Sequence, residues 1–192
     1  MGREFELKYT ATRERLVAIQ GIWDGWSVIL METTYFDTPE SALSGQKCTL
    51  RQRMENGISV CTLKTPAVGF GRGEWEAQAL WSKETVRELF AAAGREMIPF
   101  EELIPVCGAR FTRLAKIVEL ADCTVEIALD EGVLLGGCKE IPLCELEVEL
   151  KNGAEESAVD WACQLAAQYG LSQQMESKFR RALNLAKGEG HE

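Results

Sequence analysis

The chain has little of what an active site based on histidine or thiols requires. Its single histidine, His191, stands next to the last residue in a Gly-rich tail, where no fixed position is expected. Its cysteines form no Cys-x-x-Cys pair, and this scatter indicates reduced, mostly buried thiols. They are Cys48, Cys61, Cys107, Cys123, Cys138, Cys144 and Cys163. Catalysis by histidine and zinc binding by histidine are therefore excluded.

Long apolar runs and an excess of positive charge are also missing. Residues 1–8 are charged, so we expect no secretory signal, and no apolar run is long enough to cross a bilayer. Acidic side chains outnumber basic ones by 30 to 21, which argues against a protein that binds nucleic acid through a basic surface. We therefore predict a cytoplasmic protein without nucleic-acid or membrane partners. A polyanionic ligand would have to be bound by a local basic cluster or through metal ions.

The composition suits one compact domain, which we expect to span residues 1–187 and to be followed by a disordered tail at 188–192. Of the 192 residues, 46% are hydrophobic and 27% are charged, which is enough for a sizeable core. Local patterns predict a short helix or loop at 99–105. They predict helices at 12–21, 83–93, 155–169 and 172–186, and strands at 3–9, 27–32, 34–37, 47–54, 58–64, 72–79, 112–120, 125–130 and 144–151.

Charged side chains share one face of most of these strands. Successive side chains of a strand point to opposite faces, so residues two apart lie together. The groups that share a face in this way are Glu4, Glu6 and Lys8; Thr49, Arg51 and Arg53; Thr62 and Lys64; Arg72, Glu74 and Glu76; Glu126 and Asp130; and Glu145, Glu147, Glu149 and Lys151.

Two interpretations fit these charged faces. Each one alone fits the solvated side of an antiparallel sheet. Together, the repeated Glu-x-Glu and the amphipathic helices that can cover the apolar faces favour a closed barrel with the charges inside. Clustered carboxylates without histidine or thiolate partners suit Mg²⁺ or Mn²⁺, and clustered Arg and Lys suit phosphate oxygens. The pattern therefore predicts metal-assisted phosphoryl transfer.

The order of the charged blocks resembles that of the triphosphate tunnel metalloenzymes, also called the CYTH superfamily. Residues 4–8, Glu-Phe-Glu-Leu-Lys, resemble its Glu-x-Glu-x-Lys signature. Further blocks follow in family order at 34–39, 50–53, 64, 72–76, 126–130, 144–147 and 177–180. The resemblance spans nearly the whole chain and implies an α+β fold. In that fold, a closed eight-stranded antiparallel β-barrel forms a tunnel with helices packed outside it.

The resemblance also implies roles for individual residues. Catalytic roles fall on Glu4, Glu6 and Lys8; triphosphate binding on Lys8, Arg51, Arg53, Lys64, Arg113 and Lys178; metal binding on Glu4, Glu6, Asp130, Glu145 and Glu147; and supporting roles on Arg72, Glu74, Glu76 and Glu126. Ion pairs from Glu74 and Glu76 are expected to orient the basic residues.

Two positions depart from this scheme. Phe111 interrupts a pair of basic residues that the family often has, so the sequence leaves open whether Arg110 or Arg113 meets the phosphate. Glu149 and Lys151 extend the acidic face, and they fit a solvated strand end equally well.

Within the family, residues 127–132 and 144–147 resemble bacterial inorganic triphosphatases. The leading prediction is thus a metal-dependent phosphoanhydride hydrolase that cleaves tripolyphosphate, a small-molecule triphosphate, to pyrophosphate and phosphate. An adenylate cyclase comes second, because no feature of the sequence identifies the nucleobase pocket that it needs. A thiamine or nucleoside triphosphatase comes third, and thiamine is disfavoured because the aromatic Trp75 lies on the wrong strand face to stack on a ligand. A polyphosphate-binding module without turnover is the non-enzymatic alternative. The preferred substrate, the preferred metal and the formation of a homodimer are left open.

Overall fold

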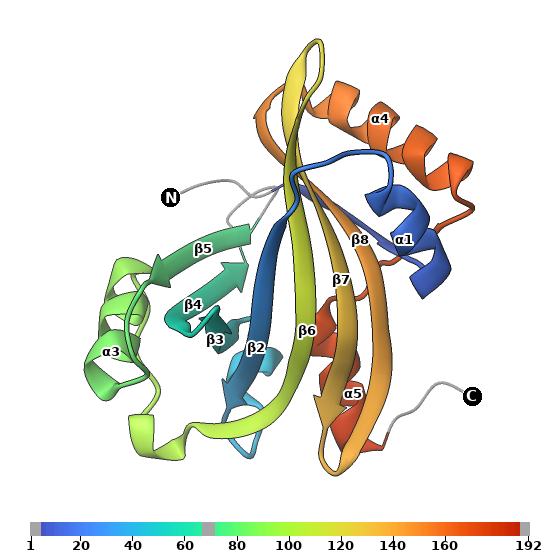
Figure 1. Ribbon diagram of the computed structural model, residues 1–192. Helices are drawn as coiled ribbons and strands as arrows, with labels where there is room; N and C mark the ends of the chain where they lie inside the picture. The colour runs from blue at the N-terminus through green and yellow to red at the C-terminus, as the bar shows by residue number, and fades with distance from the viewer. Residues whose placement is uncertain (1–4, 67–71, 189–192) are drawn as a thin grey trace.

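The computed structural model describes residues 5–66 and 72–188, which are organised around one antiparallel sheet (Figure 1). The strand order is β5-β4-β3-β2-β6-β7-β8-β1-β9. The strands are β1 (Glu6–Thr10), β2 (Ser27–Asp37), β3 (Thr49–Glu55), β4 (Ile58–Pro66), β5 (Arg72–Ala77), β6 (Ile104–Glu119), β7 (Cys123–Gly136), β8 (Lys139–Gly153) and β9 (Ser172–Gln173). The helices are α1 (Arg13–Gln20), α2 (Ala42–Gly45), α3 (Lys83–Ala92), the 3-10 turn η1 (Phe100–Glu102), α4 (Glu155–Gln168) and α5 (Lys178–Lys187).

Three helices cover the outer face of the sheet, as the sequence predicts. The outer face is the one that carries residues such as Leu50 and Leu146. Helix α3 packs on β4 and β5, and helices α1 and α4 pack on β7 and β8 (Figure 1). The side chains in these two clusters are apolar, and each fully buried Leu or Val contributes roughly 1.5–3 kcal/mol. No helix in the described part of the chain is both long and apolar enough to cross a membrane.

Helix α5 is different, because it packs on the inner face, which carries Arg113 and Glu147. Ala182 of α5 is fully buried in a cluster with Phe111, Leu134 and Leu143. The sequence predicts a helix from residue 172, but the chain first forms β9, which pairs with Tyr9 and Thr10 of β1. Ser177 then accepts a hydrogen bond from the backbone N–H of Arg180 and caps α5.

The sheet is not closed, so the expected eight-stranded barrel is not what the structure shows. Among the described residues, the strand at one edge is β5 and the strand at the other is β9, and no pairing joins them. Closure would require the free edge of β1 to pair with β5. In the structure β9 takes hydrogen bonds of that edge at Tyr9 and Thr10, and β1 has only five residues.

The central strands are longer than the sequence patterns indicate. β6, β7 and β8 have 16, 14 and 15 residues, whereas we expected 112–120, 125–130 and 144–151. The segments 27–32 and 34–37 form one strand, β2. Propensity underestimates these strands because Pro105, Gly108 and Gly132 lie inside them, and long-range pairing overrides the local signal.

Candidate functional site

A cavity of about 1270 Å³ lies against the inner face of the sheet. Every strand from β1 to β8 contributes to its wall, and so does the start of helix α5. Its charged lining residues belong to the strand faces that the sequence predicts to be charged. The open sheet therefore still gathers these charges around one space.

One wall of the cavity is basic. Arg51 and Arg53 of β3 and Lys64 of β4 line it, and carboxylates hold each of them. Glu74 of β5 lies 3.7 Å from Arg51 Nη2 and 3.3 Å from Lys64 Nζ. Glu55 accepts a hydrogen bond of 2.6 Å from Arg53 Nε. Cations fixed in this way suit phosphate oxygens, since their side chains are ordered before a ligand arrives.

Burial and a neighbouring positive charge both act on Arg53. Burial lowers the pKa of the guanidinium, and the nearby charge of Arg51 lowers it further, while Glu55 raises it. Two guanidinium groups this close create a strongly positive region. An anion that binds between them would relieve this repulsion.

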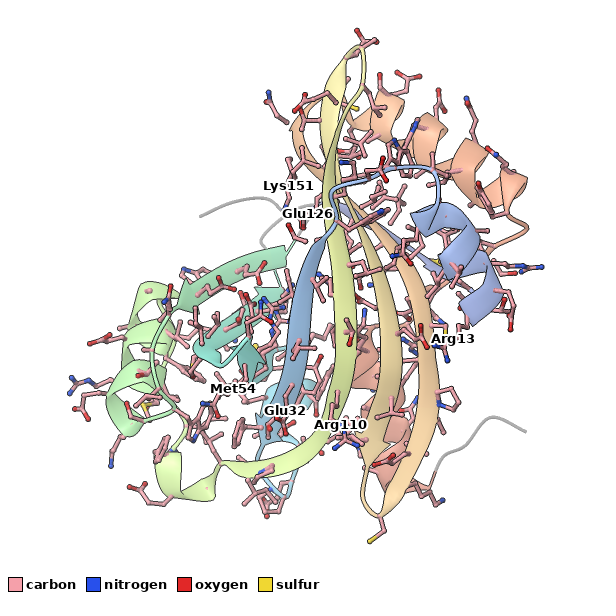
Figure 2. All side chains as sticks on the ribbon, in the orientation of Figure 1. Arg13, Glu32, Met54, Arg110, Glu126 and Lys151 are labelled. Atoms are coloured by element: carbon pink, nitrogen blue, oxygen red, sulfur yellow. The ribbon has the colours of Figure 1, made fainter. Side chains whose placement is uncertain are left out.

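The wall formed by β1, β7 and β8 is acidic. Glu6 pairs in register with Glu149, and Glu149 pairs with Glu126, so three neighbouring strands place a carboxylate in one row of the inner face. All three line the cavity. Lys151 reaches Glu149 at 2.8 Å and Glu126 at 3.5 Å, and Figure 2 shows Glu126 and Lys151 close together. Lys8 lies 3.4 Å from Glu6.

A largely buried ion-pair network forms part of the cavity wall and continues beneath it. We use this name for Asp130, Glu145, Glu147, Arg113, Lys178 and Arg181. Arg113 binds Asp130 with two hydrogen bonds, of 2.8 and 2.7 Å, and also bonds Glu147. Arg181 of α5 bonds Glu145.

Lys178 is at the centre of this network. Its Nζ lies 2.8 Å from Asp130, 2.7 Å from Glu145 and 2.6 Å from Glu147. Burial lowers the pKa of Lys178, but these carboxylates outweigh it and raise the pKa well above its usual value. Burial likewise raises the pKa of Glu147, and the charges of Lys178 and Arg113 reverse this and hold it far below its usual value. Both groups are therefore charged at neutral pH.

The sequence leaves open whether Arg110 or Arg113 meets the phosphate, and the structure places only Arg113 at the cavity. Arg113 lines the cavity, whereas Arg110 lies on the outer face with its side chain 60% exposed and 3.4 Å from Glu140. Figure 2 shows Arg110 near Glu32, its partner in the β2–β6 register. Phe111 lies beneath the cations, with Lys178 Nζ 5.4 Å and Arg113 Cζ 5.8 Å from its ring centre. Such contacts are attractive cation–π interactions.

Most of the residues expected at the site line the cavity, with four exceptions. Glu4 lies outside the described residues, and the side chain of Arg72 is not described. Asp130 and Glu145 are fully buried in the ion-pair network and are not among the residues that line the cavity. The other expected residues lie on its wall: Glu6, Lys8, Arg51, Arg53, Lys64, Glu74, Glu76, Arg113, Glu126, Glu147 and Lys178.

Two charged residues of the site, Glu55 and Arg181, are not among those predicted from the sequence. Glu55 continues the parity of Arg51 and Arg53, so strand alternation could have identified it. Arg181 stands three residues after Lys178, and that spacing puts both on one side of a helix. Nothing in the sequence shows, however, that this side faces the carboxylates of β7 and β8.

The chain is similar in sequence to a known family and to a curated protein. The CYTH domain family matches residues 2–183. The inorganic triphosphatase of Haemophilus influenzae is 32% identical over 162 residues, which are 80% of this chain and 45% of that protein. The chain thus spans about half the length of this curated relative.

Solved structures resemble the chain in fold. A putative adenylyl cyclase from Hippeastrum, described as having a dominant triphosphatase activity, superposes with a TM-score of 0.67 at 14% identity, covering 100% of this chain and 97% of that one. A putative adenylate cyclase from Bacillus halodurans gives a TM-score of 0.59 at 19% identity, covering 94% of this chain and 98% of that one. At these identities the similarity shows a common fold.

Proposed function

The chain belongs to the CYTH domain family, and on this basis we propose that it hydrolyses inorganic triphosphate to pyrophosphate and phosphate with the help of a divalent metal ion. The proposal rests on one observation: a basic wall and an acidic wall line the same cavity. Arg51, Arg53 and Lys64 stand on one wall, and a row of carboxylates stands on the other. The 32% identity to an inorganic triphosphatase supports the same substrate class.

The basic wall is suited to bind and orient the polyanion. A linear triphosphate carries several negative charges along a short chain, and fixed guanidinium groups can each offer paired N–H donors to its oxygens. Arg113 and Lys8 extend the positive surface toward the acidic side. A substrate held by the basic wall and by these two residues would have its scissile bond close to the carboxylates. Such positioning is the main contribution that a protein makes to phosphoryl transfer.

The acidic row offers the type of ligand that a hard divalent cation prefers. Glu6, Glu126 and Glu149 offer carboxylate oxygens from three adjacent strands, and Mg²⁺ and Mn²⁺ prefer such ligands. We propose that Glu6 and Glu149 hold the metal, together with Glu4, which stands two residues before Glu6 in the sequence. A divalent ion held there would neutralise phosphate charge and activate a water.

The direct test is phosphate release from tripolyphosphate with Mg²⁺, with Mn²⁺ and with excess chelator. We expect activity only with metal, and a loss of about a hundredfold in turnover for Glu149→Gln, as for removal of a group that stabilises transition-state charge. Glu140→Gln is the matched control, because Glu140 is exposed on β8 and does not line the cavity. Full activity in chelator, or equal activity of the two variants, would refute the proposal.

An adenylate cyclase is the second candidate. The volume of the cavity, about 1270 Å³, is larger than a triphosphate alone requires and could admit a nucleoside triphosphate. Assaying cyclic AMP formation from ATP beside phosphate release separates the two functions. Thiamine triphosphate ranks lower, because Trp75 packs in the outer-face cluster with α3 and cannot stack on a ligand in the cavity.

A further inference from the structure

We propose that Lys178 is the resident cation of the Asp130–Glu145–Glu147 cluster, and that this cluster positions Arg113 and helix α5 instead of binding the metal. The inference deepens the proposed function, since it decides which carboxylates are left for the catalytic ion. It also changes the role that the sequence gives to Asp130, Glu145 and Glu147.

The distances support an ammonium ion at the centre of the cluster. One oxygen from each of the three carboxylates lies within 4.8 Å of the others, a spacing that would suit a metal ion. The Lys178 Nζ already lies 2.6–2.8 Å from all three residues. It donates a hydrogen bond to Glu147 Oε1, and its contacts with Asp130 and Glu145 are close ion pairs.

Charge balance leads to the same conclusion. The three carboxylates face three cations, Arg113, Lys178 and Arg181, so the network is neutral as it stands. A divalent ion beside Lys178 would introduce like-charge repulsion in a buried site, where such repulsion is strong. The backbone that carries Lys178 is anchored, since Ala182 one turn later is fully buried against β6, β7 and β8.

The network has a clear structural role in the site. Asp130 binds two nitrogens of Arg113, which restricts the guanidinium to one orientation at the cavity wall. Arg181 and Lys178 tie α5 to Glu145 on β8. Asp130, Glu145 and Arg181 are thus positioning residues, because they act on the substrate only through Arg113 and Lys178.

The first experiment counts bound Mn²⁺ by electron paramagnetic resonance and titration calorimetry on the intact chain without triphosphate. Asp130→Asn and Glu145→Gln should bind Mn²⁺ with the stoichiometry of the parent and with a dissociation constant within about threefold of it. Glu149→Gln should weaken Mn²⁺ binding by about tenfold or more, because a ligand charge is lost. Loss of Mn²⁺ from the Asp130 or Glu145 variant, with retention in the Glu149 variant, would overturn the inference.

The second experiment uses Lys178→Met, which keeps an unbranched, flexible side chain of similar size and removes its charge. The three carboxylates then lack their central cation, so this variant should bind one more Mn²⁺ per chain than the parent. Mn²⁺ should also raise its melting temperature more than that of the parent. An unchanged stoichiometry would contradict the inference. If Lys178→Met does not fold in chelator, folding on addition of Mn²⁺ supports the inference, and failure to fold with Mn²⁺ counts against it.

These measurements are independent of catalysis. A chain that releases no phosphate from tripolyphosphate would refute the proposed function alone, because the Mn²⁺ counts would still decide the role of Lys178. In an active enzyme, Asp130→Asn should raise KM for tripolyphosphate while the metal concentration for half-maximal activity stays unchanged. A purely structural defect would not separate these two constants.

Discussion

At the scale of single residues, Arg51 and Arg53 show how one strand can serve both core and site. Their neighbours Leu50 and Leu63 are fully buried on the outer face, while the arginines line the cavity. Arg51→Ala and Arg53→Ala should therefore each raise KM for tripolyphosphate by about tenfold or more, since each removes a charge-assisted phosphate contact. Arg110→Ala is the matched control on the outer face and should leave KM unchanged. Steady-state kinetics and thermal unfolding of the three variants check this, and unfolding of the arginine variants at room temperature would contradict it.

Glu147 makes stability depend on pH. Its pKa in the folded state is far below the value of about 4.3 expected in an unfolded chain. Between these two values the unfolded state binds a proton that the folded state does not, so the free energy of unfolding falls as pH falls below about 5. Denaturant unfolding between pH 7 and pH 3 measures this slope.

Glu147→Gln removes the titrating group and should flatten that slope. The variant should also be less stable at pH 7, because Lys178 and Arg113 lose a buried partner. Glu149→Gln serves as the control, since it removes a carboxylate from the same strand face without touching Lys178. Equal slopes for the parent and Glu147→Gln would mean that Glu147 does not carry the acid sensitivity.

At the scale of elements, the docking of helix α5 depends on the absence of a side chain on β7. A Cβ atom at Gly136 would lie 2.5 Å from the carbonyl oxygen of Ala182 and 2.5 Å from the backbone nitrogen of Ala186. Gly136→Ala should destabilise the protein by about 1–3 kcal/mol, because backbone atoms cannot move aside easily. Gly45→Ala is the control, since nothing lies within 4 Å of its Cβ and Gly45 is in a helix. Urea unfolding compares the two variants, and equal stability would show that α5 tolerates displacement.

The elements also show what the sequence can and cannot predict. The positions of α1, α3 and α4 follow from local patterns, and so does the side of the sheet that they cover. The place of α5 does not, because its own sequence gives no sign that Lys178 and Arg181 will meet carboxylates on β7 and β8. The alternation of side chains along a strand correctly places Glu145 and Glu147 on one face of β8. It cannot show that Glu145 is fully buried beneath α5 while Glu147 reaches the cavity.

At the scale of the whole molecule, one sheet carries two separate outer cores. One core gathers α3 on β4 and β5, and the other gathers α1 and α4 on β7, β8 and β1. The sequence predicts the charged inner face, but the structure does not show the closed barrel that the sequence also favours, because closure depends on which strand pairs with the edge of β1. That edge pairs with β9, a segment of two residues with no strand signal of its own.

A ligand in the cavity should join the two sides of this open sheet. The basic residues of β3 and β4 belong to one side, and Glu6 and Glu149 belong to the other. Bound substrate and metal would contact both, so opening either side would first require loss of the ligand. At a ligand concentration of 100 times the dissociation constant this linkage is worth about 2.7 kcal/mol.

Hydrogen exchange with Mg²⁺ and a non-hydrolysable imido analogue of triphosphate tests this coupling. We expect backbone amides of β3 and β4 and those of β1 and β8 to exchange at least about tenfold more slowly with the ligand than without it. The double variant Arg51→Ala Arg53→Ala is the control, because it retains the acidic row but lacks two phosphate contacts, and its exchange should change little under the same conditions. Protection confined to β3 and β4 would show that the polyanion binds the basic wall alone. The two walls would then not act on one ligand, and the geometry on which hydrolysis depends would be absent.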